Sequence, residues 1–417
     1  MCVRLYFIQM KFYFKTYGCK LNEVDSELLR GLLLRNFKEV KDFKGADFVV
    51  INTCGVVDRT EKKIIEKTKY FQNKGKKVFW TGCLPLITKN NISNGSIGPN
   101  NILDIEKVIK ENIHVYNKER IDKAFLYEYK KEKVSLNVAI SEGCLGDCSY
   151  CGSKIARGKL NSFSKEKILE EIKKTNAKEI LLTSQGLASY GLDKGTQELP
   201  SLISDILKIE KDFKLRLGMM NPRFTINIID DLIELYKNEK VYKFLHLPLQ
   251  SGDNDLLYQM NRGYTADDFL NIVKKFKKVS SDTILATDII VGHPKESKEA
   301  FQKTVKIIEE VKPEILHVFR YSKREGTKDF ELKELSTKIK KQRSKYLVDL
   351  FQNYNLKKNK EFLNKEFEVL VIQKYGLART DSGRAVVVKN VRVGERRKVK
   401  IVDFKWNYLI GEALKSQ

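Results

Sequence analysis

The chain has 417 residues, of which 42% are hydrophobic, so it can build two or three domains with real cores. No apolar stretch approaches the ~18 residues that span a bilayer, and the first ten residues do not resemble a signal peptide, so we expect a cytoplasmic protein with no membrane partner. The net charge of +24 favours a nucleic-acid partner, and seven cysteines in such a chain favour metal ligation over disulfides.

The first segment, from Lys11 to about Tyr116, alternates apolar runs of strand length with amphipathic runs of helical period. Strands and helices in this order form a parallel βαβαβ unit, which is an open α/β sheet. We expect strands at Phe12–Tyr17, Asp47–Ile51 and Lys77–Thr81, and helices at Glu23–Arg35, entered at Asn22, and at Glu61–Gln72.

A cysteine follows each of these three strands. Cys19 follows a Tyr-Gly pair, Cys54 stands between Thr and Gly, and Cys83 follows a Thr-Gly pair. Because the carboxyl ends of parallel strands meet at one edge of a sheet, the three thiols can converge, and the glycines let backbone approach a bulky inorganic group. We expect a metal cluster here, with three unrelated buried cysteines as the alternative. Cys2 has no partner in register and is expected to be a free thiol.

The second segment, from about Lys133 to Tyr321, contains a CxxxCxxC loop directly after its first strand. Three thiolates at Cys144, Cys148 and Cys151 can hold three irons of a four-iron cluster and leave the fourth iron open. Structural zinc, the alternative, would need a fourth ligand, and no histidine lies close in sequence. Six βα units predict an incomplete TIM-like (β/α)6 barrel with its site at the carboxyl ends of the strands. The expected strands are Leu136–Ile140, Glu179–Thr183, Phe213–Leu217, Phe244–Leu247, Leu285–Val291 and Ile315–Arg320.

The last segment is a helical stretch from Glu331 to about Lys360 followed by a Val-rich tail. Short alternating runs separated by glycines predict a small OB-like β-barrel in the tail. Residues 361–417 contain twelve Lys and Arg against seven Asp and Glu, and Phe404, Trp406 and Tyr408 lie among them, as suits an RNA-contacting surface. The basic residues near the turns are Arg379, Arg384, Arg392, Arg396, Arg397 and Lys398, and the expected strands are Phe367–Gln373, Ala378–Thr380, Ala385–Val388, Arg397–Phe404 and Tyr408–Ala413.

The CxxxCxxC loop, with Tyr150 just before its last cysteine, resembles the cluster loop of radical S-adenosylmethionine (SAM) enzymes. From about residue 11 onward the chain resembles the methylthiotransferases of that superfamily. The resemblance rests on the Thr-Tyr-Gly-Cys turn at Cys19, the Thr-Gly-Cys turn at Cys83, and the cluster loop, which continues to Ala-Arg-Gly at Arg157. The Gly-Cys-Leu-Gly start of the loop, Lys154, and the segment 216–222 are similar to the archaeal and eukaryotic branch. The resemblance divides the chain into an amino-terminal methylthiotransferase domain (10–118), a radical SAM core (130–355) and an RNA-binding TRAM domain (360–416).

The family implies two [4Fe-4S] clusters and SAM as cofactors. Cys144, Cys148 and Cys151 would hold the SAM-cleaving cluster, and Cys19, Cys54 and Cys83 an auxiliary cluster that carries a sulfur. One SAM would methylate this sulfur and a second would become the radical that acts on the substrate, a reaction beyond the reach of acid–base side chains. Contacts to SAM are implied for Tyr150 and for residues in the loops that follow the strands, namely Ser184, Gln185, Gln250 and Gly292.

The archaeal and eukaryotic branch acts on C2 of N6-threonylcarbamoyladenosine (t6A) at position 37 of tRNA. The resemblance therefore implies the tRNA anticodon loop as substrate, with a reductant protein such as ferredoxin or flavodoxin and a separate sulfur donor. Other readings are methylthiolation of an isopentenyl-type adenosine, methylthiolation of a ribosomal-protein aspartate, and a non-catalytic iron–sulfur RNA-binding regulator.

Three residues near these motifs have more than one interpretation. His293 stands where the family usually has an aromatic residue and Lys295 where it has a glycine, so His293 is either a packing surface or an acid or base. Arg157 either places a guanidinium near the cluster site or forms a structural salt bridge.

Overall fold

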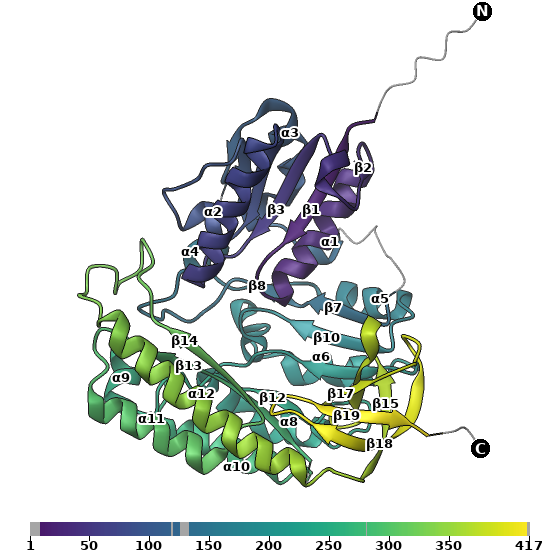
Figure 1. Ribbon diagram of the computed structural model, residues 1–417, viewed down its shortest axis with the longest axis vertical. Helices are drawn as coiled ribbons and strands as arrows, with labels where there is room; N and C mark the ends of the chain where they lie inside the picture. The colour runs from purple at the N-terminus through teal and green to yellow at the C-terminus, as the bar shows by residue number, and fades with distance from the viewer. Residues whose placement is uncertain (1–8, 118–119, 126–132, 281, 415–417) are drawn as a thin grey trace, which may run out of the picture.

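The computed structural model describes residues 9–117, 120–125, 133–280 and 282–414 (Figure 1). Cys2 lies outside this range. The expected α/β architecture is confirmed, with an amino-terminal open sheet, a central partial barrel and a closed five-stranded barrel at the carboxyl end. No helix in the described ranges has the length and apolar character needed to cross a membrane.

The amino-terminal domain is an all-parallel sheet in the order β2-β1-β3-β4-β5-β6. The predicted βαβαβ unit forms its centre, whereas three strands of only two or three residues extend it and are too short to show periodicity. The elements are β1 (Lys11–Thr16), α1 (Lys20–Leu34), β2 (Lys38–Glu39), β3 (Phe48–Thr53), α2 (Asp58–Asn73), β4 (Lys77–Gly82), β5 (Gly95–Ile97), α3 (Ile105–Glu111) and β6 (His114–Val115).

Helix α1 begins earlier than the start expected at Asn22. It begins directly after Cys19, which is its N-cap residue, so Asn22 lies buried in the first turn. The side-chain amide of Asn22 donates hydrogen bonds to the carbonyls of Tyr17 (2.9 Å) and Thr53 (2.8 Å). Asn22 therefore ties the Cys19 turn to the end of β3, where Cys54 follows.

The central domain has six parallel strands in the order β7-β10-β11-β12-β13-β14, and bridges at Leu215–Val241 and Met219–His246 join its two halves. This is the expected incomplete barrel. Its strands are β7 (Ser135–Ala139), β10 (Glu179–Thr183), β11 (Lys214–Leu217), β12 (Phe244–His246), β13 (Ile284–Val291) and β14 (Ile315–Arg320), with a small hairpin of β8 (Ser141–Glu142) and β9 (Asn161–Ser162). Its helices are α4 (Ser153–Arg157), α5 (Lys165–Lys174), α6 (Leu199–Leu207), α7 (Pro222–Thr225), α8 (Ile229–Tyr236), α9 (Asn254–Gln259), α10 (Ala266–Lys277) and α11 (Lys298–Val311).

The amino-terminal domain sits on the β7 edge of the barrel, above it in Figure 1. Helix α1 makes this contact, and the Asn137 amide of β7 donates to the Glu23 carboxylate at 2.9 Å. The two domains therefore meet on the side of the barrel where the chain enters the CxxxCxxC loop.

A long helix, α12 (Thr337–Lys360), covers β14 and leads to the carboxy-terminal barrel (Figure 1). Ser336 caps it by accepting a hydrogen bond from the Ile339 N–H, so the helix begins six residues later than expected. Trp406 of the barrel packs edge-on against Phe351 of α12, with ring centroids 5.6 Å apart. The barrel strands are β15 (Glu366–Val371), β16 (Leu377–Thr380), β17 (Ala385–Val388), β18 (Arg396–Phe404) and β19 (Leu409–Ala413), in the closed order β15-β16-β17-β19-β18.

The carboxy-terminal barrel docks at the amino ends of the central strands. Arg379 pairs with Glu179 at the start of β10 (2.9 Å), and Arg384 pairs with Asp282 just before β13. The expectation that these two arginines and Trp406 belong to an RNA surface is therefore wrong, because they hold the barrel against its neighbours. Arg392, in the turn before β18, and Lys398, in β18, are exposed, so RNA contact stays a prediction for them.

Candidate active site

Cys19, Cys54 and Cys83 gather at the carboxyl edge of the amino-terminal sheet, as expected. The Cys83 N–H donates to the Thr53 carbonyl at 3.1 Å, which joins the last two loops, and a Cβ placed on Gly18 would lie only 3.1 Å from the Cys54 Cβ. Burial raises the pKa of Cys83 to about 11 despite Arg157, and the proximity of Cys19 and Cys54 adds to the rise. Three thiols that meet at one edge of the sheet suit a shared metal cluster.

The second set of thiols lies in the loop after β7 and β8. Cys144 accepts a hydrogen bond from the Gly146 N–H at 3.2 Å, and its pKa is raised by burial and, secondarily, by Cys148 and Cys151. Gly143 has a φ of +76°, and a Cβ there would lie 1.9 Å from the Lys159 carbonyl oxygen, so only glycine fits. The loop therefore holds three sulfurs around one point and turns backbone N–H groups towards them.

The two thiol sets lie on either side of α4, which begins two residues after Cys151. Cys83 packs against Ala156 of α4 together with Ile87, while the backbone N–H groups of Ser153 and Lys154 in the first turn of α4 lie near Cys151 and oppose the rise that burial causes in its pKa. A helix of five residues is about 7.5 Å long. The thiols of the amino-terminal domain are thus neither dispersed nor turned away from the barrel.

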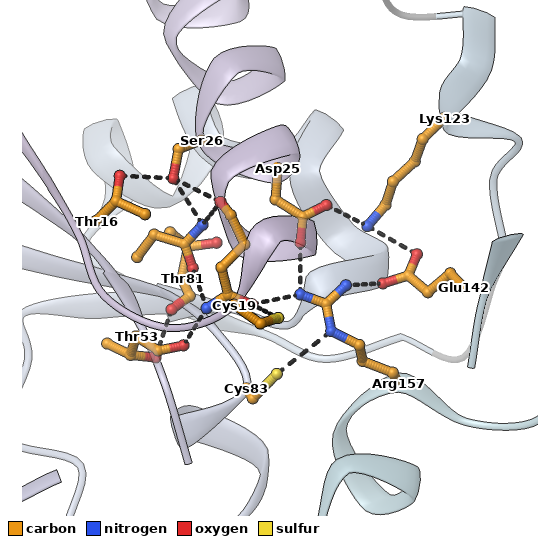
Figure 2. Close-up of polar contacts among 12 residues, drawn as sticks. Thr16, Cys19, Asp25, Ser26, Thr53, Thr81, Cys83, Lys123, Glu142 and Arg157 are labelled. Atoms are coloured by element: carbon orange, nitrogen blue, oxygen red, sulfur yellow. Dashed lines mark hydrogen bonds and ion pairs between the residues drawn. The ribbon is translucent and has the colours of Figure 1, made fainter. Parts of the chain in front are cut away.

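Arg157, the last residue of α4, both forms a structural salt bridge and places its guanidinium next to a cluster cysteine (Figure 2). Its guanidinium pairs with Glu142 and Asp25 at 2.6 Å each, and Lys123 bridges the same two carboxylates at 2.7 Å each. Its remaining nitrogen, Nε, donates to the Cys83 sulfur at 3.4 Å. All four charged side chains are at most 3% exposed, and although burial alone would raise the pKa of Asp25, Arg157 and Lys123 lower it.

A second buried arginine, Arg262, donates a hydrogen bond to a cysteine of the CxxxCxxC loop. Its Nη1 donates to the Cys148 sulfur at 3.1 Å and lies 3.4 Å from the Tyr150 hydroxyl, while its Nε donates to the Tyr264 hydroxyl at 3.1 Å. In the described part of the chain no carboxylate pairs with Arg262. Sequence reasoning missed this residue, which lies far from the loop in sequence and in no motif.

The residues expected to contact SAM lie at the carboxyl ends of the barrel strands. Ser184 and Gln185 follow β10, and the Gln185 side-chain oxygen is buried without a hydrogen-bond partner among the described residues, so it could accept from an ammonium group. Gln250 follows β12 with a left-handed φ of +69°, and its N–H and carbonyl bind the backbone of β13. Gly292 follows β13, where its φ is +75° and its N–H donates to Glu296 at 2.6 Å. The contacts of these residues with SAM stay predictions.

His293 is fully buried beside the cluster loop. It packs edge-on against Tyr150 (6.3 Å between centroids) and Tyr321 (5.1 Å), and its Nε2 donates to Asp329 at 2.9 Å while its Nδ1 accepts from the Lys295 N–H. Burial lowers the pKa of His293 despite the pull of Asp329. The residue is therefore a neutral packing and hydrogen-bonding element that supports Tyr150.

A group of three polar residues comes from the neighbouring strands β12, β13 and β14, and no sequence motif contains the three as a unit. One oxygen of Asp288 accepts hydrogen bonds from His246 (3.0 Å) and His317 (2.8 Å), and these bonds lower the pKa of Asp288 against the effect of burial. The three ligand atoms lie within 4.8 Å of one another. One carboxylate oxygen thus binds one ring nitrogen of each imidazole, which joins the three side chains in one hydrogen-bonded unit.

Comparisons with known proteins match all three domains. Family models match residues 138–308 (radical SAM superfamily), 11–100 (uncharacterized protein family UPF0004) and 363–414 (TRAM domain). A probable threonylcarbamoyladenosine tRNA methylthiotransferase of Archaeoglobus fulgidus is 41% identical, covering 98% of this chain and 100% of the relative, and one of Methanocaldococcus jannaschii is 40% identical, covering 98% and 99%. A solved radical SAM methyltransferase from Kitasatospora setae shares the fold, with a TM-score of 0.53 and 11% identity over 78% of this chain and 77% of that one.

Proposed function

Because the chain belongs to the threonylcarbamoyladenosine tRNA methylthiotransferases, a radical SAM family, we propose that its six described cysteines hold the two [4Fe-4S] clusters of this activity. The enzyme methylthiolates C2 of t6A at position 37 of tRNA, with SAM as both methyl donor and radical source. Cys144, Cys148 and Cys151 hold the SAM-cleaving cluster, and Cys19, Cys54 and Cys83 hold the auxiliary cluster.

The observation that carries this proposal is the placement of two thiol triads on the two sides of α4. Each triad offers three sulfurs, which leaves one iron of a four-iron cluster free for a further ligand. Cys83 packs against the helix whose first turn follows Cys151, so clusters held by the two triads would both lie next to α4 and could serve one substrate. When bound, the clusters and SAM supply the radical chemistry and the sulfur that no side chain can provide.

The protein's own residues position these groups. Gln185 would offer its unpartnered oxygen to the ammonium group of SAM, and Gln250 and Gly292 shape the neighbouring loops through left-handed backbone. Tyr150 is fixed by Arg262 and by the ring of His293. The domains proposed from the sequence are 10–118, 130–355 and 360–416. They place these residues in the second domain, the auxiliary-cluster cysteines in the first and the RNA contacts in the third.

The substrate is the anticodon loop of tRNA, and the TRAM domain and the net charge of +24 support binding of this polyanion. An anticodon loop is already partly open, so less unstacking energy is needed to expose the target base. We place the enzyme in the cytoplasm, where tRNA, a reductant such as ferredoxin or flavodoxin, and a sulfur donor would meet it.

The test compares Cys54→Ala with Cys148→Ala in anaerobically reconstituted full-length protein. We expect Cys54→Ala to release deoxyadenosine from SAM but form no methylthio product, and Cys148→Ala to do neither. Mass analysis of tRNA nucleosides gives the product, and a protein substrate or an isopentenyl-type adenosine carrying the modification would redirect the substrate assignment. Normal product from Cys54→Ala would refute the auxiliary cluster.

A further inference from the structure

Two buried arginines contact the two thiol triads, one arginine to each. Arg157 donates to Cys83 at 3.4 Å, and Arg262 donates to Cys148 at 3.1 Å. They come from different elements, since Arg157 ends α4 and Arg262 follows α9. Both are largely or fully buried, so water competes little for their N–H groups.

Arg157 is held by charges that cancel. Its two terminal nitrogens are fixed by Glu142 and Asp25, and Lys123 completes a set of two cations and two anions (Figure 2). The only guanidinium nitrogen left, Nε, faces Cys83. Arg157 therefore offers the auxiliary triad one oriented N–H donor from a network with no net charge.

Arg262 is held by neutral groups. The hydroxyl of Tyr264 fixes its Nε and is itself anchored by donating to the Pro248 and Leu249 carbonyls. Among the described residues, the sulfur of Cys148 is the hydrogen-bond partner of Arg262 that can carry a negative charge as a thiolate ligand, since its other two partners are tyrosine hydroxyls. Burying a cation without an anion costs free energy, and no carboxylate offsets the positive charge of Arg262. That charge therefore acts on the neighbouring sulfur of Cys148.

We propose that Arg157 and Arg262 are positioning residues that set the reduction potentials of the two clusters, one arginine for each; this inference rests on the two-cluster function proposed above. Reduction adds negative charge to the cluster and its sulfurs, and an N–H donor or a cation at a ligand sulfur stabilises that charge. Each arginine therefore raises the potential of its own cluster. The effect of Arg262 is the larger because no carboxylate offsets its charge.

The experiment measures midpoint potentials by redox titration with electron paramagnetic resonance. Full-length protein is prepared in two backgrounds, one with Cys19, Cys54 and Cys83 changed to Ala and one with Cys144, Cys148 and Cys151 changed to Ala. Each background receives Arg157→Lys, Arg262→Lys or Lys123→Arg. The two lysine substitutions keep the positive charge but remove the N–H that faces sulfur, and Lys123→Arg alters the same buried network without touching a sulfur.

We expect Arg157→Lys to shift only the auxiliary cluster to a more negative potential and Arg262→Lys to shift only the SAM-cleaving cluster, with Lys123→Arg shifting neither. Arg262→Met, which also removes the charge, should shift its cluster further than Arg262→Lys does. Unchanged potentials in both lysine variants, or an equal shift in Lys123→Arg, would overturn the proposal. A variant that cannot hold its cluster also counts against it, because the proposal assigns the arginines to potential and not to assembly. A wild-type iron and sulfide content below two four-iron clusters would instead refute the proposed function.

Discussion

The buried network around Lys123 predicts a large and non-additive loss of stability. Lys123→Met leaves Asp25 and Glu142 with Arg157 as their only cation, in a site where every side chain is at most 3% exposed. Breaking a buried ion pair by removing one partner costs about 3–5 kcal/mol, because an uncompensated charge stays buried. Adding Glu142→Gln restores neutrality, so the double variant should recover about 2 kcal/mol relative to the sum of the single variants.

The assay is urea unfolding followed by tryptophan fluorescence. Trp406→Phe leaves Trp80 as the sole tryptophan, and Trp80 is fully buried in β4, so the signal reports on the amino-terminal domain. The matched control is Lys20→Met, which removes an exposed partner of Glu23 from the same helix and should cost at most about 1 kcal/mol. The prediction fails if Lys123→Met and Lys20→Met lower the free energy of unfolding equally. It also fails if the effects of Lys123→Met and Glu142→Gln simply add in the double variant, because the two side chains would then not interact as a buried ion pair.

Three further outcomes follow from the geometry. Gly143→Ala should abolish the SAM-cleaving cluster and spare the auxiliary one in iron analysis, whereas Gly195→Ala, with a φ of +95° but open space around its Cβ, should retain both. Because the pKa of His293 is lowered in the folded protein, the free energy of unfolding should fall as pH drops below about 6.5, by at most about 1.4 kcal/mol per pH unit. In denaturant titrations His293→Gln should flatten this pH dependence, and an unchanged pH dependence in the variant would contradict the burial of a neutral His293. Tyr375, 99% exposed at a turn of the TRAM domain, should stack on RNA, so Tyr375→Ala should weaken tRNA binding about tenfold at every salt concentration in filter-binding assays, and a loss confined to low salt would point to charge instead.

The sequence predicted those parts of the site that strand ends position. Cys19, Cys54 and Cys83 could be brought together on paper because parallel strands end at one edge, and the CxxxCxxC loop is local. Arg262 could not be placed, since its approach to Cys148 depends on how the loop after α9 folds back over the barrel.

Two physical causes account for the parts that sequence reasoning misjudged. Basic and aromatic residues such as Arg379 and Trp406 are typical of an RNA surface. In the structure Arg379 pairs with Glu179 and Trp406 packs on Phe351, and these contacts depend on how the domains dock, which the sequence pattern does not show. The short strands β2, β5 and β6 were missed for a different reason, because two or three residues cannot display an alternation.

The attachment of the TRAM domain has a consequence for how a target nucleotide is chosen. Its ion pairs lie at the amino ends of the central strands, whereas both sets of thiols lie beyond the carboxyl ends. An RNA gripped by the small barrel must pass along the outside of the large one before a base can enter. The span between grip and chemistry is then fixed by the length of the strands, so the enzyme can select a base by its separation from the gripped region of a folded RNA as well as by its identity.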